Sequence, residues 1–218
     1  MIPAEVAPDS LRVSRVLTAT EAEGPGRRTA IWVQGCTIRC RGCFNPHMWA
    51  ADGATVVPVR EWTASLLDAA RAARVEGITL LGGEPFEQAA PLAYVASAAR
   101  EQGVSVMTFT GYEYRDLLAW SDTRADIRAL LENTDLLADG PYEADNLDPT
   151  RPWIGSTNQQ LRALTGRYRH LDFVTTPDRL EIRVDADGSV AVNGWQALDA
   201  LDELLEGLGT RADRPRTR

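Results

Sequence analysis

The sequence predicts an α/β domain whose central sheet consists mainly of parallel strands. Short apolar runs of strand length alternate with longer segments that repeat apolar residues at helical spacing. Glycine, proline or polar residues follow most of the apolar runs. Strands that alternate with helices in this way favour a parallel sheet with right-handed crossovers. With 218 residues, 44% of them hydrophobic and 25% charged, the chain is long enough for one ordinary globular core.

The first predicted elements are strands. Residues 11–17 alternate roughly between apolar and polar side chains, which predicts a short edge strand. Gly24-Pro25-Gly26 marks a turn, and the apolar residues 29–33 then predict a strand that leads into a loop. Residues 50–57 are expected to be a connector.

Helices and strands then alternate up to residue 138. The helices are predicted where apolar residues recur every three or four positions, and the strands are the short apolar runs between them. In chain order the prediction is helix 58–73, strand 78–81, helix 86–101, strand 104–109, helix 114–131 with an interruption near residue 121, and strand 136–138.

The last third of the chain is less regular. Residues 140–160 are polar and contain prolines, and a loop of that length is usually functional or mobile. Residues 181–184 and 189–192 predict a β-hairpin, and residues 198–208 an amphipathic helix. The prediction is one domain over residues 1–208, with its core at about 29–160 and the hairpin and helix at about 180–208. An arginine-rich, disordered tail is predicted for residues 209–218.

Charge and composition exclude several classes of function. The formal net charge is −8, which argues against a broad nucleic-acid-binding surface. The sequence contains no lysine, so Schiff-base chemistry and a P-loop are excluded. No apolar run approaches the ~20 residues that span a bilayer, and no signal peptide is recognisable. We therefore expect a cytoplasmic protein that binds neither membrane nor nucleic acid.

All three cysteines of the chain lie in one short loop after the strand at 29–33. Cys36, Cys40 and Cys43 are spaced Cys-x3-Cys-x2-Cys, and a disulfide would leave one of them unpaired. Three thiolates in such a loop can hold three corners of a [4Fe-4S] cluster and leave the fourth iron open. The alternative is a structural zinc site, which His47 would complete as a Cys3His set.

Several other candidate residues follow predicted strands. The carboxyl ends of parallel strands meet at one edge of a sheet, where ligand sites form. In Gly82-Gly83-Glu84-Pro85 the glycines allow close approach of a ligand, and the carboxylate can accept hydrogen bonds from an ammonium group. The other interpretation is a tight β–α turn with an acidic first-turn residue. The candidates at this edge are Cys36, Gly82, Gly83, Glu84, Thr110 and Asp139.

The cysteine pattern resembles the signature of the radical S-adenosylmethionine (SAM) enzymes. The flanking residues resemble more closely the activating proteins of anaerobic ribonucleotide reductase. The motifs that carry this resemblance are Gly24-Pro25-Gly26-Arg27, Gln34-Gly35, Gly42-Cys43-Phe44-Asn45, Trp49, Gly82-Gly83-Glu84-Pro85, Thr110-Gly111-Tyr112, Asp139-Gly140-Pro141 and Gly155-Ser156-Thr157-Asn158-Gln159.

The resemblance implies an open partial (β/α) barrel of the radical SAM type that holds a [4Fe-4S] cluster and S-adenosyl-L-methionine. It implies reductive cleavage of SAM to methionine and a 5′-deoxyadenosyl radical, which installs a glycyl radical on a partner enzyme. A flavodoxin- or ferredoxin-type protein would supply the electron. The implied cluster ligands are Cys36, Cys40 and Cys43, and the implied cofactor-binding residues are Gly82, Gly83, Glu84, Thr110, Asp139 and Phe44.

Two other functions compete with this interpretation. A radical SAM enzyme could instead modify a small molecule or a peptide, with the carboxy-terminal elements closing the barrel over it. A non-catalytic interaction module would use the cysteines only to hold zinc or a closed cluster. Both radical SAM interpretations predict cleavage of SAM, and the non-catalytic interaction module predicts none.

Overall fold

The computed structural model describes residues 8–173, 175–177, 179–184, 188 and 190–194. It contains a seven-stranded mixed sheet in the order β3-β1-β2-β4-β5-β6-β7. Neighbouring strands from β2 to β6 run parallel, and β1, β3 and β7 pair antiparallel with their neighbours. The predicted α/β class with a mainly parallel centre is therefore confirmed.

The elements have the following bounds. The strands of the main sheet are β1 Ser10–Thr20, β2 Arg28–Val33, β3 Thr55–Pro58, β4 Gly77–Gly82, β5 Ser105–Phe109, β6 Leu136–Asp139 and β7 Gln160–Ala163. The helices are α1 Val59–Ala72, α2 Ala89–Glu101, α3 Tyr114–Ser121 and α4 Ala125–Glu132, with short 3-10 turns η1 Pro46–Met48, η2 Pro85–Gln88 and η3 Gly166–Tyr168. Strands β8 Leu180–Val184 and β9 Val190–Gly194 form a separate hairpin.

Two strands of the sheet were not predicted, and one was misplaced. The predicted connector at 50–57 contains most of β3, which pairs antiparallel with β1. The predicted strand at 11–17 is confirmed as part of β1, but β1 is longer and is an inner strand, so its predicted place at the edge was wrong. The predicted loop at 140–160 ends in β7, the opposite edge of the sheet. Both missed strands are only four residues long and lack the buried apolar face that makes a strand recognisable.

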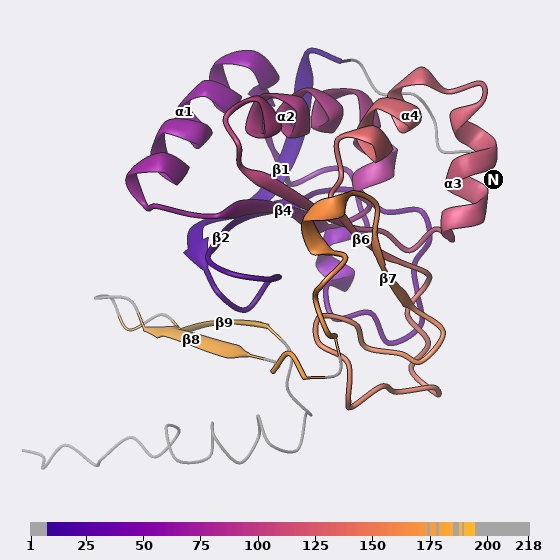
Figure 1. The fold of residues 1–218 in the computed structure, drawn as a ribbon. Helices are drawn as coiled ribbons and strands as arrows, with labels where there is room; N and C mark the ends of the chain where they lie inside the picture. The colour runs from indigo at the N-terminus through magenta and orange to yellow at the C-terminus, as the bar shows by residue number, and fades with distance from the viewer. Residues whose placement is uncertain (1–7, 174, 178, 185–187, 189, 195–218) are drawn as a thin grey trace, which may run out of the picture.

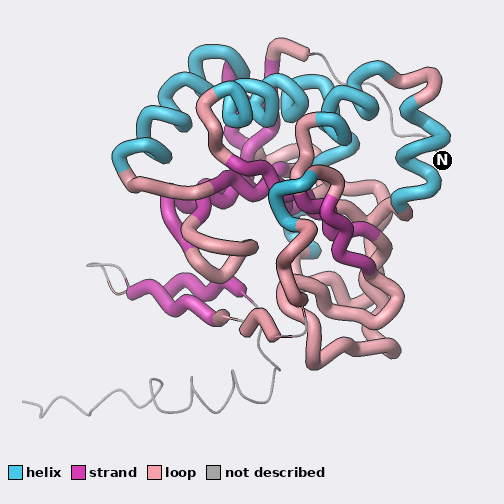
Figure 2. Tube along the Cα trace, viewed as in Figure 1, coloured by secondary structure: helices cyan, strands magenta, loops and turns pink. Residues whose placement is uncertain are grey.

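The helices cover one face of the sheet, and long loops cover the other (Figures 1 and 2). The main core lies on the helical face, where α1, α2 and α4 pack on β2, β4 and β5. On the opposite face, Met107, Leu136 and Ala138 pack against Trp153 and Ile154 of the loop that follows β6. That loop is therefore part of the folded body.

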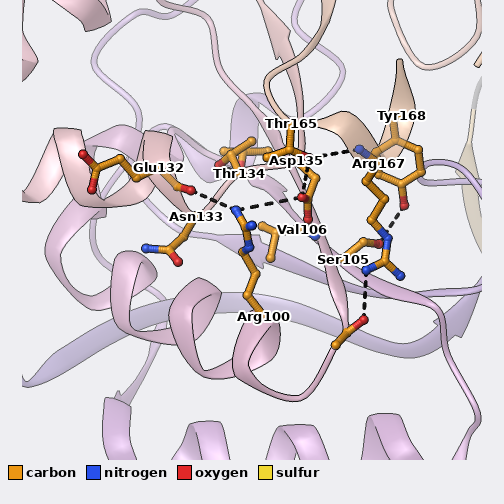
Figure 3. A network of polar contacts seen from close by, with 12 residues as sticks. Arg100, Ser105, Val106, Glu132, Asn133, Thr134, Asp135, Thr165, Arg167 and Tyr168 are labelled. Atoms are coloured by element: carbon orange, nitrogen blue, oxygen red, sulfur yellow. Dashed lines mark hydrogen bonds and ion pairs between the residues drawn. The ribbon is translucent and has the colours of Figure 1, made fainter. Parts of the chain in front are cut away.

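A polar network fixes the amino ends of the parallel strands (Figure 3). The carboxylate of Asp135 accepts hydrogen bonds from Val106 N at 2.9 Å and from Thr165 Oγ1 at 2.7 Å. The hydroxyl of Tyr168 lies 2.7 Å from Ser105 Oγ. These contacts attach the segment after β7 to the amino ends of the parallel strands. The opposite edge, at the carboxyl ends of the strands, is where ligand sites form in such sheets.

The predicted hairpin is present and packs on the turn after β1. Gly194 N donates to Glu23 Oε1 at 3.0 Å, and Asn193 Nδ2 donates to Thr20 Oγ1 at 3.0 Å. Glu21 N donates to Glu181 Oε1 at 2.6 Å. The predicted helix at 198–208 and the predicted tail lie outside the described residues, so the proposed domain bounds stay a prediction.

Replacing Glu23 by glutamine should flatten the pH dependence of folding stability. Burial raises the pKa of the Glu23 carboxyl from 4.5 to about 7. The folded state therefore binds more protons than the unfolded state between these values, and stability falls as the pH rises through this interval. Glutamine cannot ionise, and its side-chain oxygen can still accept from Gly194 N. As the pH rises, the unfolding free energy of the variant should therefore fall by less than that of the wild type, the difference being at most about 3 kcal/mol.

The measurement is urea unfolding of both proteins near pH 5 and near pH 8. The exposed Glu61, substituted by glutamine, is the control and should leave the wild-type pH dependence in place. An identical loss of stability in the wild type and in Glu23→Gln would contradict the prediction.

Candidate functional site

The cysteine loop begins where β2 ends. All six residues of β2 are buried, and Gly35 follows with a φ of 103°, which turns the chain out of the sheet. Gly35 N donates to Met48 O at 2.9 Å, and Cys36 N donates to Trp49 O at 3.0 Å. The two ends of the loop are thus joined beside the first cysteine.

Gln34 closes the base of this loop through its side chain. It is 5% exposed, and its Nε2 donates to His47 O at 3.0 Å and to Ala50 O at 2.8 Å. The sequence motif pointed to Gln34 only through resemblance, because a single amide side chain gives no signal of what it contacts. In the folded chain Gln34 adds side-chain hydrogen bonds to the backbone bonds that join the ends of the loop.

The three cysteines line an open pocket at the carboxyl ends of β2, β4 and β5. It contains about 570 Å³ of empty space, including the solvent at its mouth. The predicted site residues Gly82, Gly83, Glu84 and Thr110 lie in its wall. The complete lining is Cys36, Ile38, Cys40, Cys43, Trp49, Gly82, Gly83, Glu84, Pro85, Phe109, Thr110, Gly111, Gly140, Tyr142 and Gln159.

The Gly82-Gly83 pair allows two backbones to approach closely. Gly83 N donates to Val33 O and Glu84 N donates to Gly35 O, both at 2.8 Å. A Cβ atom on Gly83 would lie 2.3 Å from Gly35 O, and one on Gly82 would lie 2.6 Å from Val33 N. The glycines therefore fasten the turn after β4 directly to the start of the cysteine loop.

Glu84 ties the turn after β4 to the end of β5. Its carboxylate is 1% exposed and accepts hydrogen bonds from Thr110 Oγ1 at 2.8 Å, Gly111 N at 2.8 Å and Phe86 N at 2.9 Å. Burial raises the pKa of this carboxyl to about 7, although the three hydrogen bonds oppose the shift. Thr110 is thus placed beside Glu84, as its predicted position at a strand end indicated.

Burial also affects the thiols. It raises the pKa of Cys36 to about 11, with a smaller contribution from the negative charge of Glu84. Burial likewise raises the pKa of Cys40. Because metals bind the thiolate, a metal centre must displace these protons.

A second acidic residue supports the cysteine loop from outside. Glu87 Oε1 accepts from Thr37 N at 2.8 Å, from Thr37 Oγ1 at 2.6 Å and from Tyr112 OH at 3.2 Å. Tyr112 belongs to the predicted Thr110-Gly111-Tyr112 element, so that element contributes Thr110 and Gly111 to the pocket wall and Tyr112 to its support. Sequence reasoning did not find Glu87, because an acidic residue at a helix start is ordinary.

Two predicted site residues lie outside the pocket lining. Asp139 is 3% exposed and accepts from Arg162 Nε at 2.6 Å and from Tyr114 N at 3.0 Å, so its carboxylate ties β6, β7 and α3 together. Phe44 is 47% exposed, and its ring centroid lies 5.3 Å from that of Tyr142. His47, the proposed fourth zinc ligand, is exposed and is not in the lining either. Within the described ranges, no three His, Cys, Asp or Glu side chains converge on one metal position.

The loop between β6 and β7 forms the opposite wall and touches the cysteine loop. Gln159 Oε1 accepts from Gly155 N at 2.9 Å and from Ser156 N at 3.1 Å, which holds this wall in shape. Gly42 has a φ of 79°, and a Cβ there would lie 2.9 Å from Ala144 Cβ.

Replacing Gly42 by alanine should therefore loosen the contact between the two loops. The substitution combines a left-handed backbone with a close contact, and we expect a loss of about 1–2 kcal/mol in unfolding free energy. Chemical denaturation of the metal-free protein measures it, with Gly166→Ala as the control because Gly166 has open space around it. A stability equal to that of the control would contradict the prediction.

Comparison with known proteins places these residues in a family. A family model described as a 4Fe-4S single cluster domain matches residues 22–162, which include the cysteine loop and the rest of the pocket lining. The anaerobic ribonucleoside-triphosphate reductase-activating protein of Pasteurella multocida is 34% identical over 149 residues, which cover 65% of this chain and 90% of that protein. This chain belongs to that family of activating proteins.

Other activating proteins with the same name are similar to this chain over comparable lengths. The protein of the same name from Enterobacteria phage T4 is 29% identical over 168 residues, covering 73% of this chain and 99% of that protein. The Haemophilus influenzae protein is 32% identical over 143 residues, covering 62% of this chain and 87% of that protein. Family membership assigns a 4Fe-4S cluster to this chain, and all three cysteines lie within the matched range. None of the helices in the described ranges is both long and apolar enough to cross a bilayer.

Proposed function

We propose that this chain is a radical SAM activating enzyme that installs a glycyl radical on an anaerobic ribonucleoside-triphosphate reductase. The observation that carries the proposal is the shared pocket of the cysteine loop and the Gly82-Gly83-Glu84-Pro85 turn. Members of the family named for activation of that reductase support a protein as the partner. The small number of cysteines also fits, because three thiolates leave one iron of a four-iron cluster open.

In this proposal Cys36, Cys40 and Cys43 hold the cluster, and the residues across the pocket hold SAM. When bound and reduced, the cluster supplies the electron that breaks a carbon–sulfur bond of SAM, giving methionine and a 5′-deoxyadenosyl radical that takes a hydrogen atom from glycine. Glu84 suits the ammonium group of SAM, because only Gly111 N donates to its Oε2 among the described contacts and a carboxylate oxygen can accept two donors.

The remaining residues orient these groups and limit access of water. Thr110 and Gly111 hold the carboxylate of Glu84 in place. Ile38 and Phe109 present apolar side chains to the pocket, which restricts water around a reactive intermediate. Asp139 acts indirectly by fixing the strand that leads to Gly140. The exposed Phe44 packs against Tyr142 of the lining, and we assign it to contact with the partner.

The open edges of the sheet agree with a partial barrel that admits a protein loop. The edge strands are β3 and β7, and the sheet does not close between them in the described part of the chain. A one-electron donor of the flavodoxin or ferredoxin class and a cytoplasmic location complete the proposal.

The test is anaerobic reconstitution with iron and sulfide, followed by addition of dithionite and SAM and quantification of 5′-deoxyadenosine. Adding the reductase encoded by the same organism should then produce the electron paramagnetic resonance (EPR) doublet of a glycyl radical. SAM cleavage without a radical on the reductase would redirect the proposal to another substrate. A protein that takes up zinc but no iron–sulfur cluster would overturn it.

A further inference from the structure

The indole of Trp49 carries a buried hydrogen-bond donor with no partner beside the cysteines. Its Nε1 is shielded from solvent and makes no hydrogen bond among the described residues. The other buried side-chain atoms without a partner in the described part of the chain are oxygens of Asn158 and Asn193, and neither residue lines the pocket. Trp49 does line it, together with all three cysteines.

The backbone of Trp49 is fixed relative to the first cysteine. Its carbonyl accepts from Cys36 N at 3.0 Å, and its N–H donates to Pro46 O at 3.2 Å. The indole is therefore carried by the closing end of the cysteine loop, and it cannot move far from Cys36 without breaking that loop.

An indole in this position is more costly than a phenyl ring unless its N–H finds an acceptor. Buried tryptophan N–H groups usually have a partner, and leaving one unmade destabilises the folded state. Phenylalanine would supply apolar contact without that cost. Trp49 lines the same pocket as the three thiols and Glu84, so a group bound in that pocket is the candidate acceptor.

We propose that the Trp49 indole N–H donates a hydrogen bond to an acceptor atom of the bound cluster–SAM pair, either a cluster sulfur or a polar atom of SAM. The inference rests on the proposed function, since it needs both groups in this pocket. A donor to a cluster sulfur stabilises the more negative, reduced cluster and raises its midpoint potential. A donor to SAM instead strengthens SAM binding.

The experiment compares the reconstituted wild type with Trp49→Phe and with a variant carrying 3-benzothienylalanine at position 49, which keeps the bicyclic shape but lacks the N–H. The midpoint potential of the SAM-free cluster is measured by EPR-monitored redox titration, and the SAM dissociation constant by equilibrium binding. Trp120→Phe is the matched control, because its ring packs edge-on against Tyr112 and it is not in the pocket lining.

A lower potential in both variants, with the control unchanged, supports the bond and assigns it to a cluster sulfur. An unchanged potential with SAM binding weakened about two- to tenfold supports it and assigns the acceptor to SAM. Wild-type potential and wild-type SAM affinity in the benzothienyl variant would overturn the inference while leaving the proposed function intact. Failure of the wild type itself to load a cluster or cleave SAM would overturn the proposed function.

Discussion

A single methyl group at position 83 should deprive the protein of SAM cleavage. A Cβ on Gly83 would lie 2.3 Å from Gly35 O and 2.9 Å from Gly35 C, and both are backbone atoms that cannot rotate away. Gly83→Ala must therefore push the turn after β4 away from the cysteine loop. The hydrogen bond from Glu84 N to Gly35 O is then lost, and Glu84 moves with the turn. Because a misplacement of about 1 Å can cost about a hundredfold in rate, we expect at least that loss in 5′-deoxyadenosine formation.

Iron content, SAM affinity and SAM cleavage should be measured together on this variant. Gly166→Ala is the matched control, since that glycine has no neighbour within 4 Å of an added Cβ. The Gly83 variant should still fold, because the clash lies at the pocket and not in the main core. Wild-type SAM cleavage by Gly83→Ala would show that the close approach of the two turns has no part in catalysis.

Each of the substitutions Cys36→Ala, Cys40→Ala and Cys43→Ala should reduce SAM cleavage by more than about a hundredfold. Mutation of a residue that only hydrogen-bonds to a metal ligand already lowers metal affinity or activity by about 10–100-fold, and loss of a ligand should lower it further. Iron bound per chain and the charge-transfer absorption of the cluster should fall in parallel. The partial exposure of all three side chains means that the substitutions leave little cavity in the core.

The variant His47→Ala distinguishes a [4Fe-4S] site from a Cys3His zinc site. The imidazole of His47 is exposed and outside the pocket lining, so a [4Fe-4S] site predicts unchanged iron content. A Cys3His zinc site predicts that His47→Ala loses metal along with the cysteine variants. Retention of the cluster in any of the three Cys→Ala variants would contradict the ligand assignment.

The fold was predictable wherever the chain follows a strong apolar period. The β2 and β4 strands, the α1 helix and the break between α3 and α4 lie close to where the sequence places them. The short edge strands were not predictable, because strand β3 is paired to β1 by backbone contacts that side chains do not report. Because β3 was missed, β1 was wrongly placed at the edge of the sheet.

Several residues that line the pocket were predictable from the sequence, but the contacts between them were not. The rule that strand carboxyl ends share one edge brought Cys36, Gly82 and Thr110 together correctly. The same rule included Asp139, whose carboxylate turns to Arg162 instead of the pocket. Gln34 and Glu87 each support the loop through several hydrogen bonds of one side chain, and an isolated polar side chain leaves no periodic pattern in a sequence.

The backbone bond between Gly35 and Glu84 also bears on how the protein is made. The cysteine loop emerges from the ribosome first, while the residue that holds its start lies about 50 positions later along the chain. Strand β4 must form beside β2 before this hold exists, and domains fold as their segments become available during synthesis. Until then the cysteine loop lacks its backbone contact with Glu84. We therefore expect cluster insertion to be productive only after the turn that follows β4 has been translated.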